Sequence, residues 1–219
     1  MSIKDKYNLK INIMKKVFLL ISAVAILGSL HAQNTSDTRR FVLEVEYGTA
    51  SSINYSALSA FEDSKESYSM PTVSFFAGVK SSDDNNYYYG ISVESMAAHT
   101  AQPCQEMCYN TMALLSHKRS LPLWGSLNVW CGAGVGAAWI RNQYVMGGDN
   151  LKINRYGLAA KFEGGLIYNI NNCSYVGLTG GFYTVPYIKG DYNAPADYTK
   201  NGNNLIFGQQ IMLNYGVRF

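Results

Sequence analysis

The chain of 219 residues is 47% hydrophobic and 15% charged, and it contains 20 glycines and 17 tyrosines. Its apolar content excludes a disordered chain, while its charged fraction is below the roughly 25% that is usual in soluble domains. The formal charge of +3 comes from the first 32 residues, which hold five lysines and one aspartate. The remainder has 13 basic and 14 acidic residues, which excludes the basic surface of a nucleic-acid-binding protein.

Residues 1–32 have the organisation of an export signal. After Met14, two lysines precede an uncharged, mostly apolar run over 17–30, and Ala32 supplies a small residue for cleavage. As a helix this run would rise about 21 Å, which is short of a hydrocarbon core of roughly 30 Å. We therefore expect an N-terminal extension with a cleaved secretory signal over 1–32, with Met14 as the true start, and a short periplasmic lead over 33–40.

Eight later stretches alternate apolar residues with polar or small ones, which is the pattern of β-strands. In the first stretch, Phe41, Leu43 and Val45 share one face, and Glu44 and Glu46 share the other. The eight predicted strands are 41–48, 72–80, 87–95, 111–121, 124–140, 156–169, 174–184 and 204–219.

The predicted connections alternate in length along the chain. Short ones lie at 81–86, around 120–123 and at 169–172, and long ones cover 49–71, 96–110, 141–155 and 185–203. An up-and-down sheet with all its short turns at one end gives this pattern, as does an outer-membrane barrel with short periplasmic turns and longer extracellular loops.

The fifth stretch lacks charge but does not have the pattern of a transmembrane helix. Gly132, Gly134 and Gly136 recur every two residues, so they share one face of a strand, whereas in a helix each would cost about 1 kcal/mol relative to alanine. The same glycines do not match a dinucleotide-binding fingerprint, because the spacing differs and no helix follows. We expect them to face a narrow barrel interior.

The composition of the two strand faces predicts which one is the interior. The polar faces are rich in small residues with few charges, unlike a water-facing surface, so we expect them inside, with the apolar faces toward lipid. The sheet must then close, because backbone groups in hydrocarbon need partners within the protein. The charged residues predicted to pair inside are Glu44, Glu46, Glu94, Lys161, Glu163 and Arg218.

These features together carry a resemblance to a known family. The export signal, the eight stretches, WCGAGVGAAW at 130–139 and the ending Tyr215-x-Val217-x-Phe219 resemble the small bacterial outer-membrane β-barrel proteins, the OmpA/OmpX-type and "porin family" barrels. The resemblance covers 41–219 and implies an all-β, eight-stranded antiparallel up-and-down transmembrane β-barrel. It also implies that these last residues are the signal read by the outer-membrane assembly machinery, and that the C-terminus is periplasmic.

Closure of such a barrel makes the last strand a neighbour of the first. We expect Phe219 at this seam and Arg218 pointing inward close to Glu44. The predicted role is structural, or surface interaction with an unknown extracellular partner through the long loops, in contact with outer-membrane lipid and lipopolysaccharide. Three alternatives are a small pore, a lipid-modifying outer-membrane enzyme, and a soluble ligand-binding barrel of the lipocalin or avidin kind.

Cysteine and histidine supply the remaining candidate sites, and we expect no metal and no cofactor. Cys104 and Cys108 could close a small disulfide in the second long connection, whereas a metal at this pair with His99 would need a further ligand. Pairing of Cys131 with Cys173 is left open.

Catalysis has two weak candidates, Glu94-Ser95 with His99 and the Ser116-His117 pair. Neither spacing shows a nucleophile within reach of a base. We therefore do not expect an enzyme.

The tyrosines have two predicted uses. Those near strand ends suit an aromatic girdle at the membrane surface, namely Tyr47, Tyr87, Tyr89, Tyr168 and Tyr215. Those of the fourth long connection and its approach suit either a recognition surface or packing over the barrel mouth; they are Tyr183, Tyr187, Tyr192 and Tyr198.

Overall fold

The computed structural model describes residues 40–55, 65–81, 86–100, 105–146, 149–193 and 205–219. The predicted signal over 1–32, and the lead except for Arg40, lie outside the described residues. No helix in the described part of the chain is long and apolar enough to cross a membrane.

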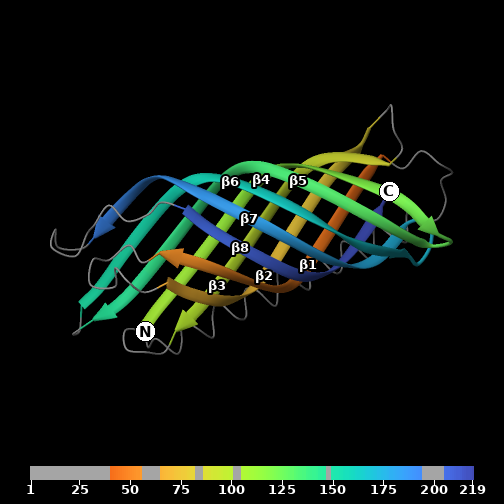
Figure 1. Ribbon diagram of the computed structural model, residues 1–219. Coiled ribbons are helices and arrows are strands. Elements are labelled where there is room, and N and C mark those ends of the chain that lie inside the picture. Colours follow the sequence, from red (N-terminus) through yellow and green to blue (C-terminus); the bar gives the residue numbers. More distant parts are fainter. Residues whose placement is uncertain (1–39, 56–64, 82–85, 101–104, 147–148, 194–204) are drawn as a thin grey trace.

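Eight antiparallel strands close into one barrel, in which each strand pairs with its neighbours in sequence and β1 pairs with β8 (Figure 1). The all-β, up-and-down fold expected from the sequence is confirmed. The strands are β1 (Phe41–Tyr55), β2 (Lys65–Lys80), β3 (Tyr87–Thr100), β4 (Gln105–Trp124), β5 (Leu127–Met146), β6 (Asp149–Asn169), β7 (Ser174–Asn193) and β8 (Leu205–Arg218).

One end of the barrel, here called the turn end, carries the connections 81–86, 125–126 and 170–173, close to where the sequence placed them. The β4–β5 turn is the exception, because β4 continues through the predicted turn at 120–123 and the register shifts between Pro122 and Trp124. The chain reverses at Gly125, whose φ of 55° is the left-handed conformation that tight hairpins use.

The opposite end, the loop end, differs from the prediction. The four long connections shrink to 56–64, 101–104, 147–148 and 194–204, because the strands continue into the segments expected to be loops. Length does not alternate as predicted, since 147–148 is shorter than the turn at 81–86. Antiparallel pairing explains the extension, because hairpin continuation satisfies backbone groups of the polar segments as well as the apolar ones.

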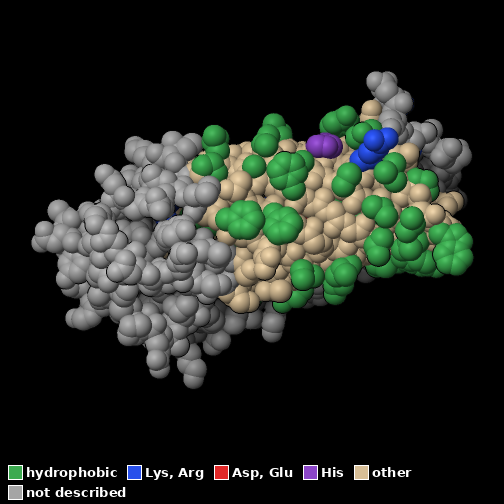
Figure 2. Space-filling view, viewed as in Figure 1, with side chains coloured by type: hydrophobic (Ala, Val, Ile, Leu, Met, Phe, Trp, Pro, Cys, Tyr) green, Lys and Arg blue, Asp and Glu red, His purple; other side chains and the backbone are tan. Residues whose placement is uncertain are grey.

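Side chains alternate strictly between the interior and the outer wall, and the wall is apolar. Leu115 is 69% exposed and Phe162 is 66% exposed, whereas Glu46 on the opposite face is 0% exposed. Figure 2 shows the hydrophobic side chains standing out from this wall. The faces therefore have the inside-out distribution predicted for a membrane barrel, and not that of a soluble one.

Aromatic side chains gather near both limits of the apolar wall. At the turn end are Phe41, Tyr87, Tyr89, Trp124, Tyr168 and Phe219, and toward the loop end the cross-strand neighbours Trp139 and Tyr156. Beyond the apolar wall, hydroxyls pair on the outer face at Ser95 with Thr111 (3.5 Å) and Thr49 with Ser69 (3.3 Å).

The seam between the first and last strands is closed by Phe219. Its N–H donates to the Phe41 carbonyl (3.0 Å), its carbonyl accepts from the Phe41 N–H (2.9 Å), and the two rings stack 6.0 Å apart. Of the other two residues in the predicted terminal signal, Tyr215 is half-buried, whereas Val217 is buried instead of facing outward to lipid.

The three glycines of β5 face the interior, as predicted. A Cβ at Gly136 would lie 2.0 Å from the Ala113 carbonyl oxygen, and one at Gly134 would lie 2.6 Å from the Ser116 hydroxyl. Strand β4 therefore packs against bare backbone here, and alanine at Gly136 would require the strands to separate.

Candidate functional site: a charge network inside the barrel

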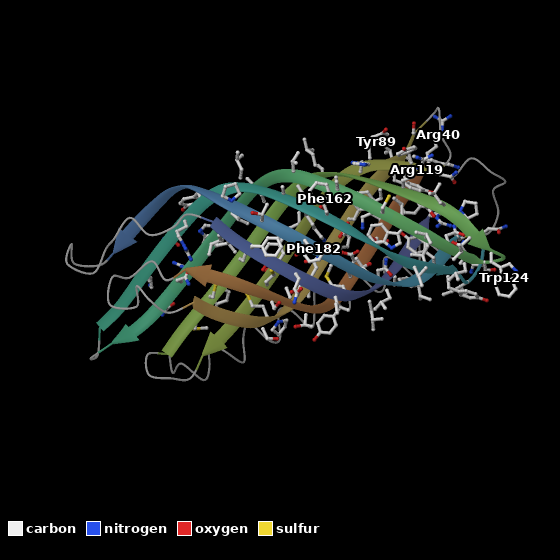
Figure 3. The ribbon with its side chains drawn as sticks, in the orientation of Figure 1. Arg40, Tyr89, Arg119, Trp124, Phe162 and Phe182 are labelled. Atoms are coloured by element: carbon white, nitrogen blue, oxygen red, sulfur yellow. The ribbon has the colours of Figure 1, made fainter. Side chains whose placement is uncertain are left out.

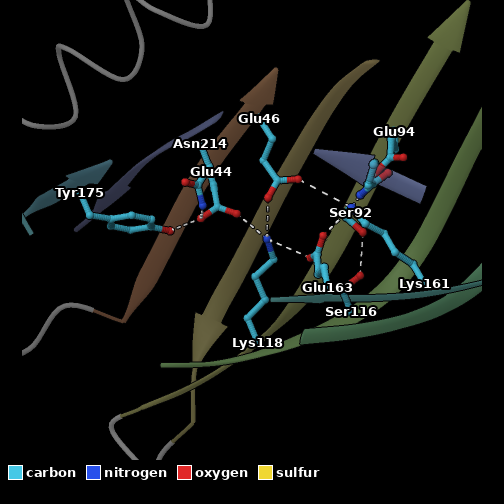
Figure 4. Close-up of polar contacts among 11 residues, drawn as sticks. Glu44, Glu46, Ser92, Glu94, Ser116, Lys118, Lys161, Glu163, Tyr175 and Asn214 are labelled. Atoms are coloured by element: carbon cyan, nitrogen blue, oxygen red, sulfur yellow. Dashed lines mark hydrogen bonds and ion pairs between the residues drawn. The ribbon is translucent and has the colours of Figure 1, made fainter. Parts of the chain in front are cut away.

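Two buried lysines connect four buried glutamates in the middle of the barrel interior (Figure 4). The glutamates come from three strands: β1 contributes Glu44 and Glu46, β3 contributes Glu94, and β6 contributes Glu163. The lysines are Lys118 on β4 and Lys161 on β6.

Lys118 contacts carboxylates on opposite sides of the barrel. Its ammonium donates to Glu44, lies 3.4 Å from Glu46 and lies 3.2 Å from Glu163. The same ammonium stands 4.4 Å from the centre of the Trp130 ring, a cation–π contact.

Lys161 extends the network toward β3. Its ammonium lies 2.6 Å from Glu94, 2.5 Å from Glu163 and 3.7 Å from Glu46. The amide of Gln210 on β8 fits with its nitrogen 2.7 Å from Glu94 and its oxygen 2.8 Å from Lys161.

Neutral donors reduce the excess of negative charge, since four carboxylates face two ammonium groups. The Tyr175 hydroxyl donates to Glu44 (2.6 Å), and the Asn214 amide donates to the same oxygen (3.5 Å). Strands β1, β3, β4, β6, β7 and β8 all contribute to one set of polar contacts. Buried charges need such saturation, because desolvation of an unpaired ion costs several kcal/mol.

Apolar layers lie on both sides of the charges. Toward the turn end, Phe76, Trp130, Ile167 and Tyr175 pack together with Val42. Toward the loop end lies a second cluster, rich in sulfur, which contains Ala50, Met70, Met96, Cys108, Met112, Leu114, Ala138, Ile140, Ala159, Tyr183, Val185 and Ile206. Methionine is flexible enough to fill an irregular gap of this kind.

A small cavity of about 20 Å³, with room for about one water molecule, lies between the turn end and the network. Glu44, Lys118, Trp130 and Arg218 are among the side chains that line it. It ends at the charges and does not reach the loop-end cluster.

The structure brings five of the six predicted interior charges together, and Arg218 is the exception. Arg218 does not form an ion pair with Glu44. Its guanidinium instead stacks 4.6 Å from the centre of the Tyr175 ring and donates to Asn169 (3.0 Å). Tyr175 occupies the place beside Glu44 that the prediction gave to Arg218, because its hydroxyl comes within hydrogen-bond distance there.

Sequence reasoning missed Lys118, the cation with the most carboxylate contacts. Its stretch, predicted as 111–121, has apolar residues on both faces, with Leu114 inward and Leu115 outward, so alternation gave no clear interior side. The signal that identifies it is register, since Lys118 follows Leu114 and Ser116 on the inward face.

The candidate catalytic groups are separated by the sheet. Glu94 is buried inside, whereas Ser95 is exposed on the wall; Ser116 faces inward, whereas His117 is exposed outside. Ser116 donates to or accepts from Ser92 (2.6 Å) and has no contact with His117, and the His99 side chain lies outside the described residues.

The predicted disulfide pairs are not both accessible to comparison. Cys108 is buried in the loop-end cluster, and Cys104 lies outside the described residues. Cys131 is exposed on the outer wall and Cys173 is buried at the turn end, and no disulfide joins them. The described residues contain no group of three or more His, Cys, Asp or Glu side chains that could hold a metal ion.

The tyrosines predicted for the fourth long connection lie mostly on a strand. Tyr183 is buried in the interior, and Tyr187 and Tyr192 belong to β7, whereas Tyr198 lies outside the described residues. Of the predicted girdle, Tyr47, Tyr89 and Tyr168 are exposed on the wall, and Tyr87 and Tyr215 are half-buried there.

Three solved structures share this architecture. The chain is similar to Neisserial surface protein A (TM-score 0.53, 14% identity, covering 82% of this chain and 97% of that one). It is also similar to Ail, the attachment invasion locus protein of Yersinia pestis (0.51, 10%, 83% and 99%). A major outer membrane protein from Thermus thermophilus gives a TM-score of 0.54 at 11% identity, covering 83% of this chain and 100% of that one.

No family model and no curated protein matches the chain. At identities of 10–14% the likeness concerns the fold. It confirms at that level the resemblance drawn from the sequence: the chain has the fold of the small eight-stranded outer-membrane β-barrel proteins.

Proposed function

We propose that this protein is an integral outer-membrane barrel with a sealed interior, whose role is structural or made through its loop end. Two observations support insertion in a membrane: an apolar wall, and aromatic side chains near both of its limits. A soluble ligand-binding barrel would expose this apolar wall to water and place four carboxylates in its core.

The observation that carries the sealed interior is the continuous filling by side chains. Lys118 reaches from β4 to glutamates on β1 and β6, so the ion pairs cross the interior instead of lining it. The sulfur-rich cluster lies in series with them. An ion would have to displace both layers, which disfavours a small pore.

The loop end supports a surface role. A transmembrane β-strand needs about 9–11 residues, whereas β6 has 21 residues and β7 has 20. The excess extends the barrel past the apolar wall, where Ser95 and Thr111 face outward. We assign this extension to the cell exterior, with the C-terminus periplasmic, so that an extracellular partner would meet strand ends as well as loops.

Membrane insertion is tested by cell fractionation and gel mobility. The full chain, expressed in a two-membraned bacterium, is expected in the outer-membrane fraction and should migrate differently with and without boiling, because a closed barrel resists detergent. Protein recovered from the periplasm or medium without detergent, and without a mobility shift, would support the soluble alternative.

The seal is tested in planar bilayers containing the purified barrel. We expect no discrete conductance steps for the natural sequence. A variant that shortens side chains in both layers, Lys118→Ala with Met112→Ala, tests whether they form the barrier and should conduct if it still folds. Discrete openings of the natural protein would contradict the seal and favour the pore.

The partners predicted from the sequence are kept as proposals on the same basis. Lipid and lipopolysaccharide would contact the apolar wall and its aromatic limits. The assembly machinery would read Tyr215, Val217 and Phe219 before closure, since Phe219 is fixed against Phe41 afterwards.

A further inference from the structure

A graded patch lies on the outer wall of β3 and β4 at the turn end. Three cross-strand pairs form successive rungs: Tyr87 with Arg119, Tyr89 with His117, and Ile91 with Leu115. Successive rungs are two residues apart along each strand, or about 7 Å. From the end inward, the patch passes from a cation through aromatic rings to fully apolar side chains.

Direct contacts order the polar half of this patch. The Arg119 guanidinium lies 4.6 Å from the centre of the Tyr87 ring. The Tyr87 and Tyr89 rings stack 6.3 Å apart with planes 9° from parallel, and the His117 ring lies 6.5 Å from Tyr89. Stacking holds the guanidinium against the wall, and Ile91 and Leu115 beyond it are more than half exposed.

Further cations lie on the same sector of the rim. Arg40 and Arg119 appear at the same end, near Tyr89, in Figure 3. Lys80 is linked to this sector because its N–H donates to the Arg40 carbonyl (2.6 Å). The connection over 82–85 adds two aspartates, so three basic side chains leave the sector net positive.

The rest of the turn end lacks this arrangement. At the same level on the described outer faces of β5 to β8 lie Leu127, Tyr168, Val176 and Tyr215, all uncharged. An aromatic girdle alone therefore does not account for the patch on β3 and β4.

We propose that this patch binds the headgroup of an anionic glycerophospholipid. Arg119 donates to the phosphodiester, the Tyr89 and His117 rings lie against the glycerol region, and Ile91 and Leu115 contact the first acyl carbons. The order of the three rungs matches the order of polarity along such a lipid. Arg40 and Lys80 favour a net negative headgroup over a zwitterionic one. The inference rests on the proposed insertion in a membrane.

The experiment uses native mass spectrometry of the full-length barrel extracted in detergent. Phosphatidylglycerol and phosphatidylcholine with identical acyl chains are offered in equal amounts. We expect preferential retention of phosphatidylglycerol. Arg119→Gln should weaken this binding about tenfold, the change expected when one charge-assisted hydrogen bond is lost, and should leave phosphatidylcholine unchanged.

The matched control is Arg141→Gln. Arg141 also stacks on an outer-wall aromatic residue, with its guanidinium 5.8 Å from the Trp139 ring, but toward the loop end. It should retain phosphatidylglycerol as the natural protein does. Equal loss in both variants, or equal retention of the two lipids, would overturn the proposal.

Two further readings separate this inference from neighbouring ones. Competition by inorganic phosphate at the strength of the lipid would indicate a free-anion site and would also overturn it. The gel-mobility shift of each variant reports whether the barrel is closed. A closed barrel without lipid preference removes this inference alone, whereas loss of the shift in the natural protein would also remove the proposed function.

Discussion

At the scale of single residues, Lys118 is the position on which the interior depends most. Lys118→Met would leave Glu44 without a cation, and breaking a buried ion pair from one side costs about 3–5 kcal/mol. We expect that loss in the free energy of unfolding, measured by urea titration in detergent. Lys152→Met, which removes the same charge from an exposed site on β6, should change it by about 0.5 kcal/mol or less. Equal midpoints for Lys118→Met and the natural protein would show that the network does not hold the strands together.

At the scale of elements, the β5–β6 hairpin distinguishes an extended barrel from a barrel with loops. The segment 141–155 was predicted to be a loop, whereas the structure pairs Arg141 with Asn154 and Gln143 with Lys152. A protease needs a locally unfolded segment, so trypsin should spare Arg141, Lys152 and Arg155 in the folded barrel and cut them after denaturation. Mass spectrometry of the fragments makes the measurement. Rapid cleavage at these three sites without denaturant would restore the loop.

At the scale of the whole molecule, closure depends on Phe219. The pair Phe41–Phe219 stacks at 6.0 Å and 23°, and Phe182–Phe207 on β7 and β8 stacks at 6.0 Å and 22°, so the second pair is a control of matched geometry. Phe219→Ser and Phe182→Ser should each cost about 1 kcal/mol of aromatic pairing in purified barrels. In cells, Phe219→Ser should lower the amount of outer-membrane protein several-fold more than Phe182→Ser does. Equal amounts would show that the last residue acts by stacking alone.

Much of this barrel follows from local alternation. Glu44, Glu46, Glu94, Lys161 and Glu163 were placed on the inward face because side-chain direction in a strand has a period of two and needs no knowledge of neighbours. The turn end was located well for a related reason, since apolar strands there meet short segments of glycine, asparagine and aspartate. The inversion of the faces also came from composition, because small residues with few charges do not make a water-facing surface.

Only the tertiary structure decided which inward residues meet. Lys118 and Glu44 are 74 residues apart, and their contact depends on how far the strands are staggered when the barrel closes. The same stagger puts Tyr175, and not Arg218, beside Glu44. Strand length at the loop end is likewise set by pairing, because a polar segment becomes a strand when its hairpin partner continues alongside it. The sequence by itself therefore determined the faces and the fold, while closure determined the ion pairs, the seal and the height of the barrel.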